Sequence, residues 1–186
     1  MENTLSSKVQ LYIAMSLDGK IAKPNDDVSW LDEIPNPDKS DYGYHDFYGG
    51  IDIVVMGNST YRFVQSMDIE YPYNGKTSYV ITRDSSLQDN EDVCYVSGDQ
   101  VLEIIKDLRK SSNKNIWLVG GGEVNTLFSN TNLIDEIILF VMPIIIGDGI
   151  PLFGQGLGEK QLILRSSQVY QSGVVELNYK FRENHS

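Results

Sequence analysis

Three short segments place glycines, hydroxyl groups or a guanidinium directly after an apolar run of the sequence. They are residues 119–123 (Val-Gly-Gly-Gly-Glu), residues 57–60 (Gly-Asn-Ser-Thr) and residues 82–83 (Thr-Arg). Glycine lets the backbone approach a phosphate closely, a helix N-terminus favours negative charge, and arginine binds phosphate through two parallel hydrogen bonds. Together, the three segments predict a site for an elongated ligand with several phosphates, such as a dinucleotide.

Each of these segments alone also fits a structural role. The consecutive glycines favour a phosphate-binding turn over a plain strand-to-helix turn, although they do not form the G-x-G-x-x-G fingerprint. Residues 57–60 alone are more typical of a helix start, with Asn58 or Ser59 as the N-cap. Arg83 alone is more typical of a solvated surface residue. The dinucleotide prediction therefore depends on the three segments occurring together.

Other chemistries lack the residues that they need. One cysteine, Cys94, and two histidines, His45 and His185, exclude a disulfide framework and predict no metal site built from Cys or His. No serine stands in a G-x-S-x-G context, and His45 is expected to pack or to face solvent, so no catalytic triad is expected. Residues 147–149 (Gly-Asp-Gly) lack the further spaced carboxylates of a calcium loop.

The length and charge of the chain limit its organisation and its partners. The 186 residues are 41% apolar and carry a formal net charge of −11, which favours one globular domain and opposes a duplex-binding surface. The N-terminal residues do not resemble a secretory signal, and the longest apolar run, residues 137–146, is about half of a bilayer span. We expect one cytoplasmic domain over residues 1–186, with a core from about 9 to 181 and no nucleic-acid or membrane partner.

The elements that position these segments follow from the apolar runs. Strands are expected at residues 9–15, 51–56, 77–82, 93–96, 115–119 and 134–146, and helices at 38–48, 58–65, 99–110 and from 123. The helix at 99–110 is expected to bury Val101, Leu102, Ile105 and Leu108. Two last strands, 162–170 and 174–181, are expected to form a hairpin through Ser172 and Gly173. Continuously apolar strands that alternate with helices indicate an α/β three-layer sandwich with a mainly parallel mixed sheet and an antiparallel C-terminal hairpin.

Five segments in this order resemble one known superfamily. They are residues 14–22 (Ala-Met-Ser-Leu-Asp-Gly-Lys-Ile-Ala), 55–61 (Val-Met-Gly-Asn-Ser-Thr-Tyr), 82–83, 119–122 and 143–153, which end in Gly-Asp-Gly-Ile-Pro-Leu-Phe. The order resembles the dihydrofolate reductase-like superfamily, and most closely the branch of the C-terminal reductase domain of the bifunctional riboflavin-biosynthesis deaminase/reductase. The first and last segments are specific to that branch, whereas the glycine turn is shared more widely.

The resemblance implies an NADPH-dependent reductase that acts as a homodimer. Asn58 stands where the superfamily commonly has an arginine, so Arg83 remains the main reason to expect NADP rather than NAD. The coenzyme-binding residues implied are Ala14, Ile21 and Ala22 at the nicotinamide; Gly57, Ser59 and Thr60 at a phosphate and its ribose; Thr82 and Arg83 at the 2′-phosphate; and Val119, Gly121, Gly122, Glu123 and Val124 at the pyrophosphate.

A reduction of this kind also needs a proton donor and a substrate pocket. Asp41 precedes Met56 by 15 residues, which matches the catalytic carboxylate of dihydrofolate reductases, although Asp46 or Asp38 could substitute and a solvated surface aspartate is the alternative. For a pyrimidine or pterin-like substrate, the expected contacts are Asp18 with ribose hydroxyls, Lys20 with a phosphate or the coenzyme, Trp30 by stacking, and the Gly147–Asp148 loop at the nicotinamide side.

Three functions remain open at this stage. The first is reduction of 5-amino-6-(5-phosphoribosylamino)uracil, with hydride transfer to a C=N or ribose C1′ acceptor. The second is dihydrofolate reduction proper, which the branch-specific segments oppose. The third is NADP binding without turnover. The zinc motif of the deaminase half needs more than one cysteine, so a stand-alone reductase domain is expected.

Overall fold

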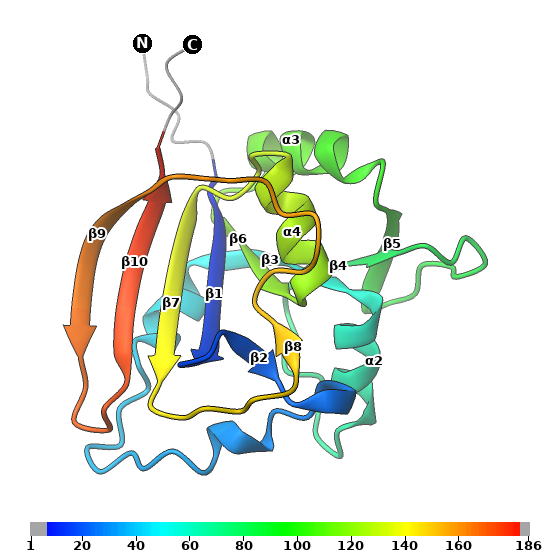
Figure 1. Ribbon diagram of the computed structural model, residues 1–186. Helices are drawn as coiled ribbons and strands as arrows, with labels where there is room; N and C mark the ends of the chain where they lie inside the picture. The colour runs from blue at the N-terminus through cyan, green and yellow to red at the C-terminus, as the bar shows by residue number, and fades with distance from the viewer. Residues whose placement is uncertain (1–6, 183–186) are drawn as a thin grey trace.

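The computed structural model describes residues 7–182 and is built around one eight-stranded sheet (Figure 1). The strand order is β5-β4-β3-β6-β1-β7-β10-β9. The first six strands of this order run parallel to one another, whereas β10 runs antiparallel to both β7 and β9. The strands are β1 (Val9–Ser16), β3 (Ile51–Gly57), β4 (Thr77–Thr82), β5 (Val93–Ser97), β6 (Asn115–Gly120), β7 (Glu136–Met142), β9 (Leu162–Val169) and β10 (Val175–Phe181).

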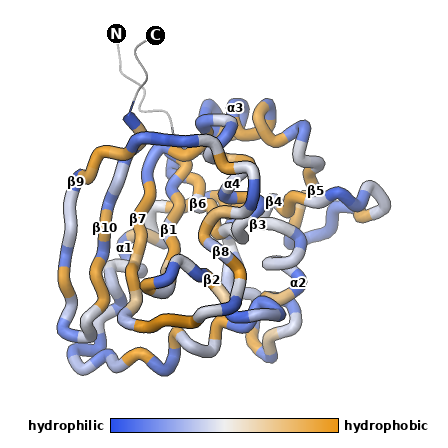
Figure 2. The backbone as a smooth tube through the Cα atoms, in the orientation of Figure 1, coloured by the Kyte–Doolittle hydropathy of each residue, from blue (hydrophilic) through white to orange (hydrophobic). Residues whose placement is uncertain are grey.

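Helices cover both faces of the sheet, which confirms the three-layer α/β prediction. On one face, α3 (Val101–Ser111) and α4 (Gly122–Asn130) pack against the central strands through buried residues such as Ile105 and Phe128. On the other face, α1 (Tyr44–Gly49) and α2 (Asn58–Ser66) pack through aromatic residues that include Tyr61 and Phe47. Figure 2 shows that the central strands carry much of the apolar sequence, as expected for strands buried on both faces.

Three expected elements have different limits in the structure. The strand expected over residues 134–146 ends at Met142, because Pro143 has no N–H to donate and the chain then leaves the sheet. The helix expected over 38–48 begins only at Tyr44, since Lys39, Tyr42 and Gly43 all have positive φ. Leu102 was wrongly expected in the core: it faces outward from α3 and is 38% exposed.

The N-cap expected at Asn58 or Ser59 lies one residue earlier. Gly57 occupies the cap position of α2, and no side chain there accepts a hydrogen bond from the first turn. The helix therefore starts directly from the end of β3. Its first N–H groups remain without an intrahelical acceptor.

The expected loop at residues 20–39 contains regular structure that covers the end of β1. A short strand, β2 (Lys20–Ala22), pairs with β8 (Ile150–Pro151), and two 3-10 turns follow at Pro24–Asp26 and Ser29–Leu31. Trp30 in the second turn is fully buried against Phe140, Met142 and Val174. Its ring has no face left for a ligand, so the stacking role expected for it is replaced by a packing role.

Asp18 joins the turn after β1 to the loop after β7. Its Oδ1 accepts hydrogen bonds from the Ser16 hydroxyl (2.7 Å) and the Ile146 N–H (3.0 Å), and its Oδ2 accepts one from the Gly147 N–H (2.8 Å). These bonds lower the pKa of Asp18 to about 2, with the Ser16 hydroxyl as the largest cause. The carboxylate therefore holds two loops together at the carboxyl edge of the sheet.

Replacing Trp30 with alanine tests its packing role. We expect Trp30→Ala to lower the free energy of unfolding by about 3–5 kcal/mol, because it removes a fully buried aromatic side chain. Leu17→Ala is the control, since Leu17 is 65% exposed and its loss should change stability by about 0.5 kcal/mol or less. Urea unfolding followed by circular dichroism measures both. Equal stability of the two variants would contradict the packing role.

The charge of Asp18 should stabilise the fold only above the pH at which the carboxyl protonates. Its folded-state pKa lies below its ordinary value, so its stabilising effect is complete above about pH 4 and is lost as the pH falls toward 2. We expect the urea midpoint of Asp18→Asn to lie below that of the wild type at pH 7 and to approach it at pH 3. Asp148→Asn, in the exposed loop that Asp18 holds, serves as the control. A difference that stays constant with pH would refute this assignment.

Candidate functional site

The carboxyl ends of β4, β3 and β6 lie side by side at one edge of the sheet. The register places Ile81 of β4 beside Gly57, and Met56 beside Gly120 of β6. Because adjacent parallel strands end at the same edge, the three segments that follow them meet there. The structure thus brings together the three segments singled out in the sequence.

Close contacts join the three segments directly. A Cβ added to Gly57 would lie 3.0 Å from Cγ2 of Val124, and one added to Gly121 would lie 3.5 Å from Oγ1 of Thr60. Arg83 at the end of β4 pairs with Glu123 in the first turn of α4, with 3.0 Å between Nη2 and Oε2. The two helix starts and the arginine therefore form one continuous surface.

Both helix N-termini at this surface are free of side-chain caps. Gly57 caps α2 and Gly121 caps α4, and neither cap makes a side-chain hydrogen bond. The first turn of each helix leaves N–H groups unpaired, and the helix dipole adds partial positive charge there. Ser59 and Thr60 lie in the first turn of α2, where their hydroxyls add polar groups beside these N–H groups.

The three glycines of the turn have separate roles. Gly120 has φ +115°, which favours glycine, and Asn125 lies beneath it with an Oδ1 that is buried without a partner. A Cβ on Gly122 would collide with the carbonyl oxygen of Pro151, so this glycine permits close packing of the β8 loop. Gly121 alone has its side-chain space between the two helix starts, where a phosphate would approach.

The polar groups of Arg83 and Thr82 differ in how accessible they are to a ligand. The Arg83 side chain is 91% exposed and the Glu123 side chain 81%, so both are reachable from solvent. Thr82 Oγ1 instead accepts a hydrogen bond from the Asp84 N–H at 3.0 Å. Arg83 is therefore an exposed cation at this edge that a ligand phosphate could reach.

The residues expected at the nicotinamide lie one strand further along the same edge. Because β1 is the neighbour of β6, Ile13 of β1 reaches to within 3.6 Å of the side-chain space of Gly120. Ala14 is half-buried on β1, and Ile21 and Ala22 lie on β2, with Ala22 only 5% exposed. The β2–β8 sheet and the Gly149 backbone cover Ala22, which leaves Ala14 and Ile21 as the more accessible of the three.

Asp41 caps the N-terminus of α1 as an exposed carboxylate. Its Oδ2 accepts the His45 N–H at 3.1 Å and its Oδ1 accepts the Gly43 N–H at 3.0 Å. These two bonds, His45 first, lower the pKa of Asp41 below its ordinary value. A general acid at neutral pH needs a raised pKa, so Asp41 in this conformation is ionised. The alternatives, Asp38 and Asp46, are also exposed.

Sequence analysis missed a group of tyrosines and one glutamate near Asp41. The Tyr170 hydroxyl donates to Oε2 of Glu176 at 2.6 Å, and the Tyr12 hydroxyl donates to the carbonyl of Tyr42 at 3.2 Å. Burial raises the pKa of Tyr12 and Tyr170, and the nearby charge of Asp41 raises both further. In the sequence, Glu176 could have been noticed as a polar residue within the alternating pattern of the last strand, β10.

The remaining expected substrate contacts lie on β2 and in the two loops that Asp18 joins. Lys20 is half-buried on β2, and Asp148 is exposed between two glycines. Both oxygens of Asp18 accept hydrogen bonds from its own loops, which supports a structural rather than a ribose-binding role. Within residues 7–182, no cluster of three or more His, Cys, Asp or Glu is arranged to hold a metal ion.

The donor set at this edge fits a dinucleotide. Two uncapped helix starts and Gly121 offer N–H groups and space to a pyrophosphate, and Arg83 offers a guanidinium to a further phosphate.

Among the described helices, none is both long and apolar enough to cross a membrane.

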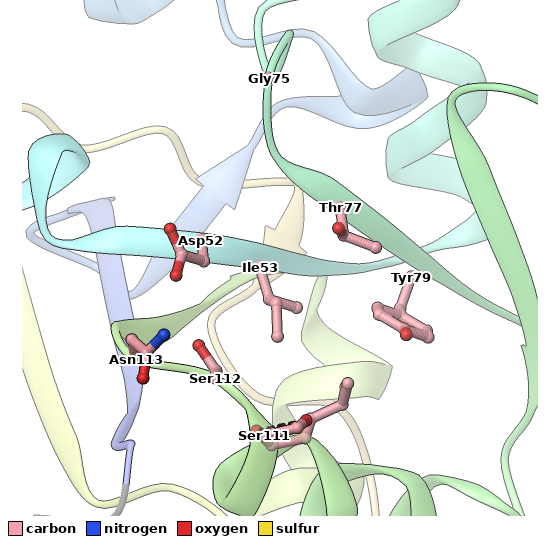
Figure 3. A pocket seen from close by; sticks show the side chains of 9 residues that line it. Asp52, Ile53, Gly75, Thr77, Tyr79, Ser111, Ser112 and Asn113 are labelled. Carbon is pink, nitrogen blue, oxygen red and sulfur yellow. Dashed lines mark hydrogen bonds between the residues drawn. The ribbon is translucent and has the colours of Figure 1, made fainter.

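A hollow lies at the opposite, amino edge of the sheet (Figure 3). Its volume is about 420 Å³, and Asp52 of β3, Thr77 of β4 and Ser111 of α3 line it. Its lining includes no residue from the glycine turn, Arg83 or the two helix starts. We assign it no part in the site, because ligands of parallel sheets bind at the carboxyl edge.

Comparison with known proteins places this geometry in a family. The family model for the RibD C-terminal domain matches residues 7–176 of this sequence. The uncharacterized proteins YwjB and YyaP of Bacillus subtilis (strain 168) are 37% and 31% identical to the chain, over 94% and 96% of it, and 98% of each relative is covered.

Solved structures share the fold. A Shewanella sp. PV-4 protein provisionally described as a riboflavin biosynthesis protein is 30% identical, with a TM-score of 0.80 over 95% of this chain and 99% of that one. A deaminase/5-amino-6-(5-phosphoribosylamino)uracil reductase from Thermotoga maritima shares 17% identity and a TM-score of 0.71 over 95% of this chain and 57% of that one. The sequence match over nearly its whole length shows that the chain belongs to the RibD C-terminal domain family.

Proposed function

We propose that this chain is an NADPH-dependent reductase that reduces 5-amino-6-(5-phosphoribosylamino)uracil or a closely related pyrimidine. The observation that carries this proposal is the convergence of Gly57, Arg83 and Gly121 at adjacent strand ends. Family membership and the reductase activity of the Thermotoga protein support the reaction class.

The chain's own groups account for coenzyme binding. The first turns of α2 and α4 would offer N–H groups to the pyrophosphate, with Ser59 and Thr60 beside them, and Arg83 would hold the adenosine 2′-phosphate. When bound, NADPH supplies the hydride. Ala14 and Ile21, one strand along, form the wall beside which the nicotinamide is expected to lie.

Asp41 is the proposed source of the proton that the reaction requires. In the conformation described it is ionised, but a substrate that covers this exposed carboxylate removes water from it and thereby raises its pKa. Asp41 would then hold a proton close to the acceptor atom.

One observation favours a second candidate, an NADP-binding protein without turnover. Both carboxylate oxygens of Asp41 accept backbone N–H groups at the start of α1, an arrangement that explains the residue without any catalytic role. Coenzyme binding with no oxidation in the presence of pyrimidine or folate substrates would favour this candidate over the reductase.

The proposal includes a cytoplasmic homodimer. The edge strand β9 exposes Leu162, Leu164 and Val169, which are 40%, 50% and 74% exposed. An apolar edge of this kind is usually covered by a partner or protected by charge. A second copy of the chain is the partner that family resemblance supports.

Loss of Arg83 tests the coenzyme assignment. We expect Arg83→Ala to raise the Kd for NADPH about tenfold, equivalent to ~1.4 kcal/mol, because a guanidinium–phosphate contact is lost. The Kd for NADH, which lacks the 2′-phosphate, should change less than about twofold. Isothermal titration calorimetry measures both, with Lys106→Ala, an exposed cation on α3, as the control. Equal weakening of both coenzymes would show that Arg83 does not meet the 2′-phosphate.

Substitution of Asp41 tests the proton donor. We expect Asp41→Asn to lower the single-turnover rate of NADPH oxidation with the ribosylaminopyrimidine about 100-fold or more, while NADPH still binds. Asp46→Asn, on the exposed surface of α1, should leave the rate unchanged. An unchanged rate in Asp41→Asn would remove this residue from the mechanism.

A further inference from the structure

The Arg83–Glu123 ion pair spans the candidate coenzyme site from one strand end to another. It connects the end of β4 with the first turn of α4 and passes across the end of β3, which lies between them in the sheet. The four other ion pairs of residues 7–182 join no two of these strand ends. The pair thus lies where Arg83 is expected to meet a phosphate.

Stability alone does not account for this pair. The side chains are 91% and 81% exposed, and ion pairs so exposed contribute little to folding. A negative side chain in the first turn of α4 is favourable on its own, because it complements the helix dipole. The consequence of the pair is that the Glu123 carboxylate competes with a ligand phosphate for the guanidinium of Arg83.

The two members of the pair favour different dinucleotides. In dinucleotide-binding proteins, an acidic side chain accepts hydrogen bonds from the unmodified adenosine ribose, whereas an arginine accommodates the 2′-phosphate. This chain carries both groups, 3.0 Å apart. A 2′-phosphate must displace the Glu123 carboxylate from Arg83 and remain beside that negative charge, whereas a free ribose 2′-hydroxyl can leave the pair intact.

We propose that Glu123 is a specificity-determining residue that weakens the preference of this site for NADPH and permits binding of NADH. This inference rests on the proposed coenzyme site. The effect is confined to the adenosine end, so Glu123 alters the choice between coenzymes rather than the hydride step. Glu123 therefore has a different role from the pyrophosphate contact that family resemblance implies for it.

Substitution of the carboxylate by an amide tests the proposal. We expect Glu123→Gln to lower the ratio of the Kd for NADPH to that for NADH by about three- to tenfold, because Arg83 is freed and the repulsion of the 2′-phosphate is removed. Isothermal titration calorimetry with each coenzyme gives this ratio without any turnover. Glu103→Gln is the matched control, since Glu103 occupies the exposed first turn of α3.

A double variant separates the competition from other effects. In the Arg83→Ala background, Glu123→Gln should improve NADPH binding much less than it does in the wild type, because the contested guanidinium is absent. If the wild type binds NADPH but Glu123→Gln leaves the coenzyme ratio unchanged, the role of Glu123 is refuted and the coenzyme site stands. If the wild type binds neither coenzyme, the proposed function and this inference both fail.

Discussion

The parallel pairing of β4, β3 and β6 is the constraint on which the candidate site depends. Each of these strands is followed by a segment that offers an arginine, a helix N-terminus or a glycine turn, and parallel adjacency puts all three at one edge. The site therefore needs no long-range movement to assemble. Burial of apolar side chains on both sheet faces fixes the register, and the register fixes which residues meet.

The other side of this edge is closed by the β2–β8 pairing, by side-chain hydrogen bonds and by close packing. Asp18 fastens the loop after β7 to the turn after β1, and Gly122 lets β8 pack closely on α4. Both devices use residues that resemble ligand-binding groups in the sequence. A carboxylate or a glycine at a strand end can thus serve the scaffold, and only its partners in the structure distinguish the two roles.

Because the protein is strongly negative overall, an anionic ligand would have to be held by groups close to it. The chain carries a formal net charge of −11, so its overall field does not attract a polyanionic coenzyme. The proposed coenzyme binding would instead come from directed groups at short range, namely helix N–H groups and the Arg83 guanidinium. In such a setting, a single carboxylate beside Arg83 would have a large relative influence on the coenzyme preference proposed for this site.

The sequence by itself determined the α/β architecture, the strand ends that carry Gly57, Arg83 and Gly121, and the family, because apolar periodicity and local motifs are encoded within short segments. It did not determine the engagement of Asp18, the burial of Trp30, the capping role of Asp41 or the pairing of Arg83 with Glu123. Three of these depend on a partner far along the chain, or on how a loop closes over the sheet, whereas the contacts of Asp41 are local but need the turn before α1 to form. Local sequence specifies which groups a residue can offer, whereas only tertiary packing decides which of them remain free for a ligand.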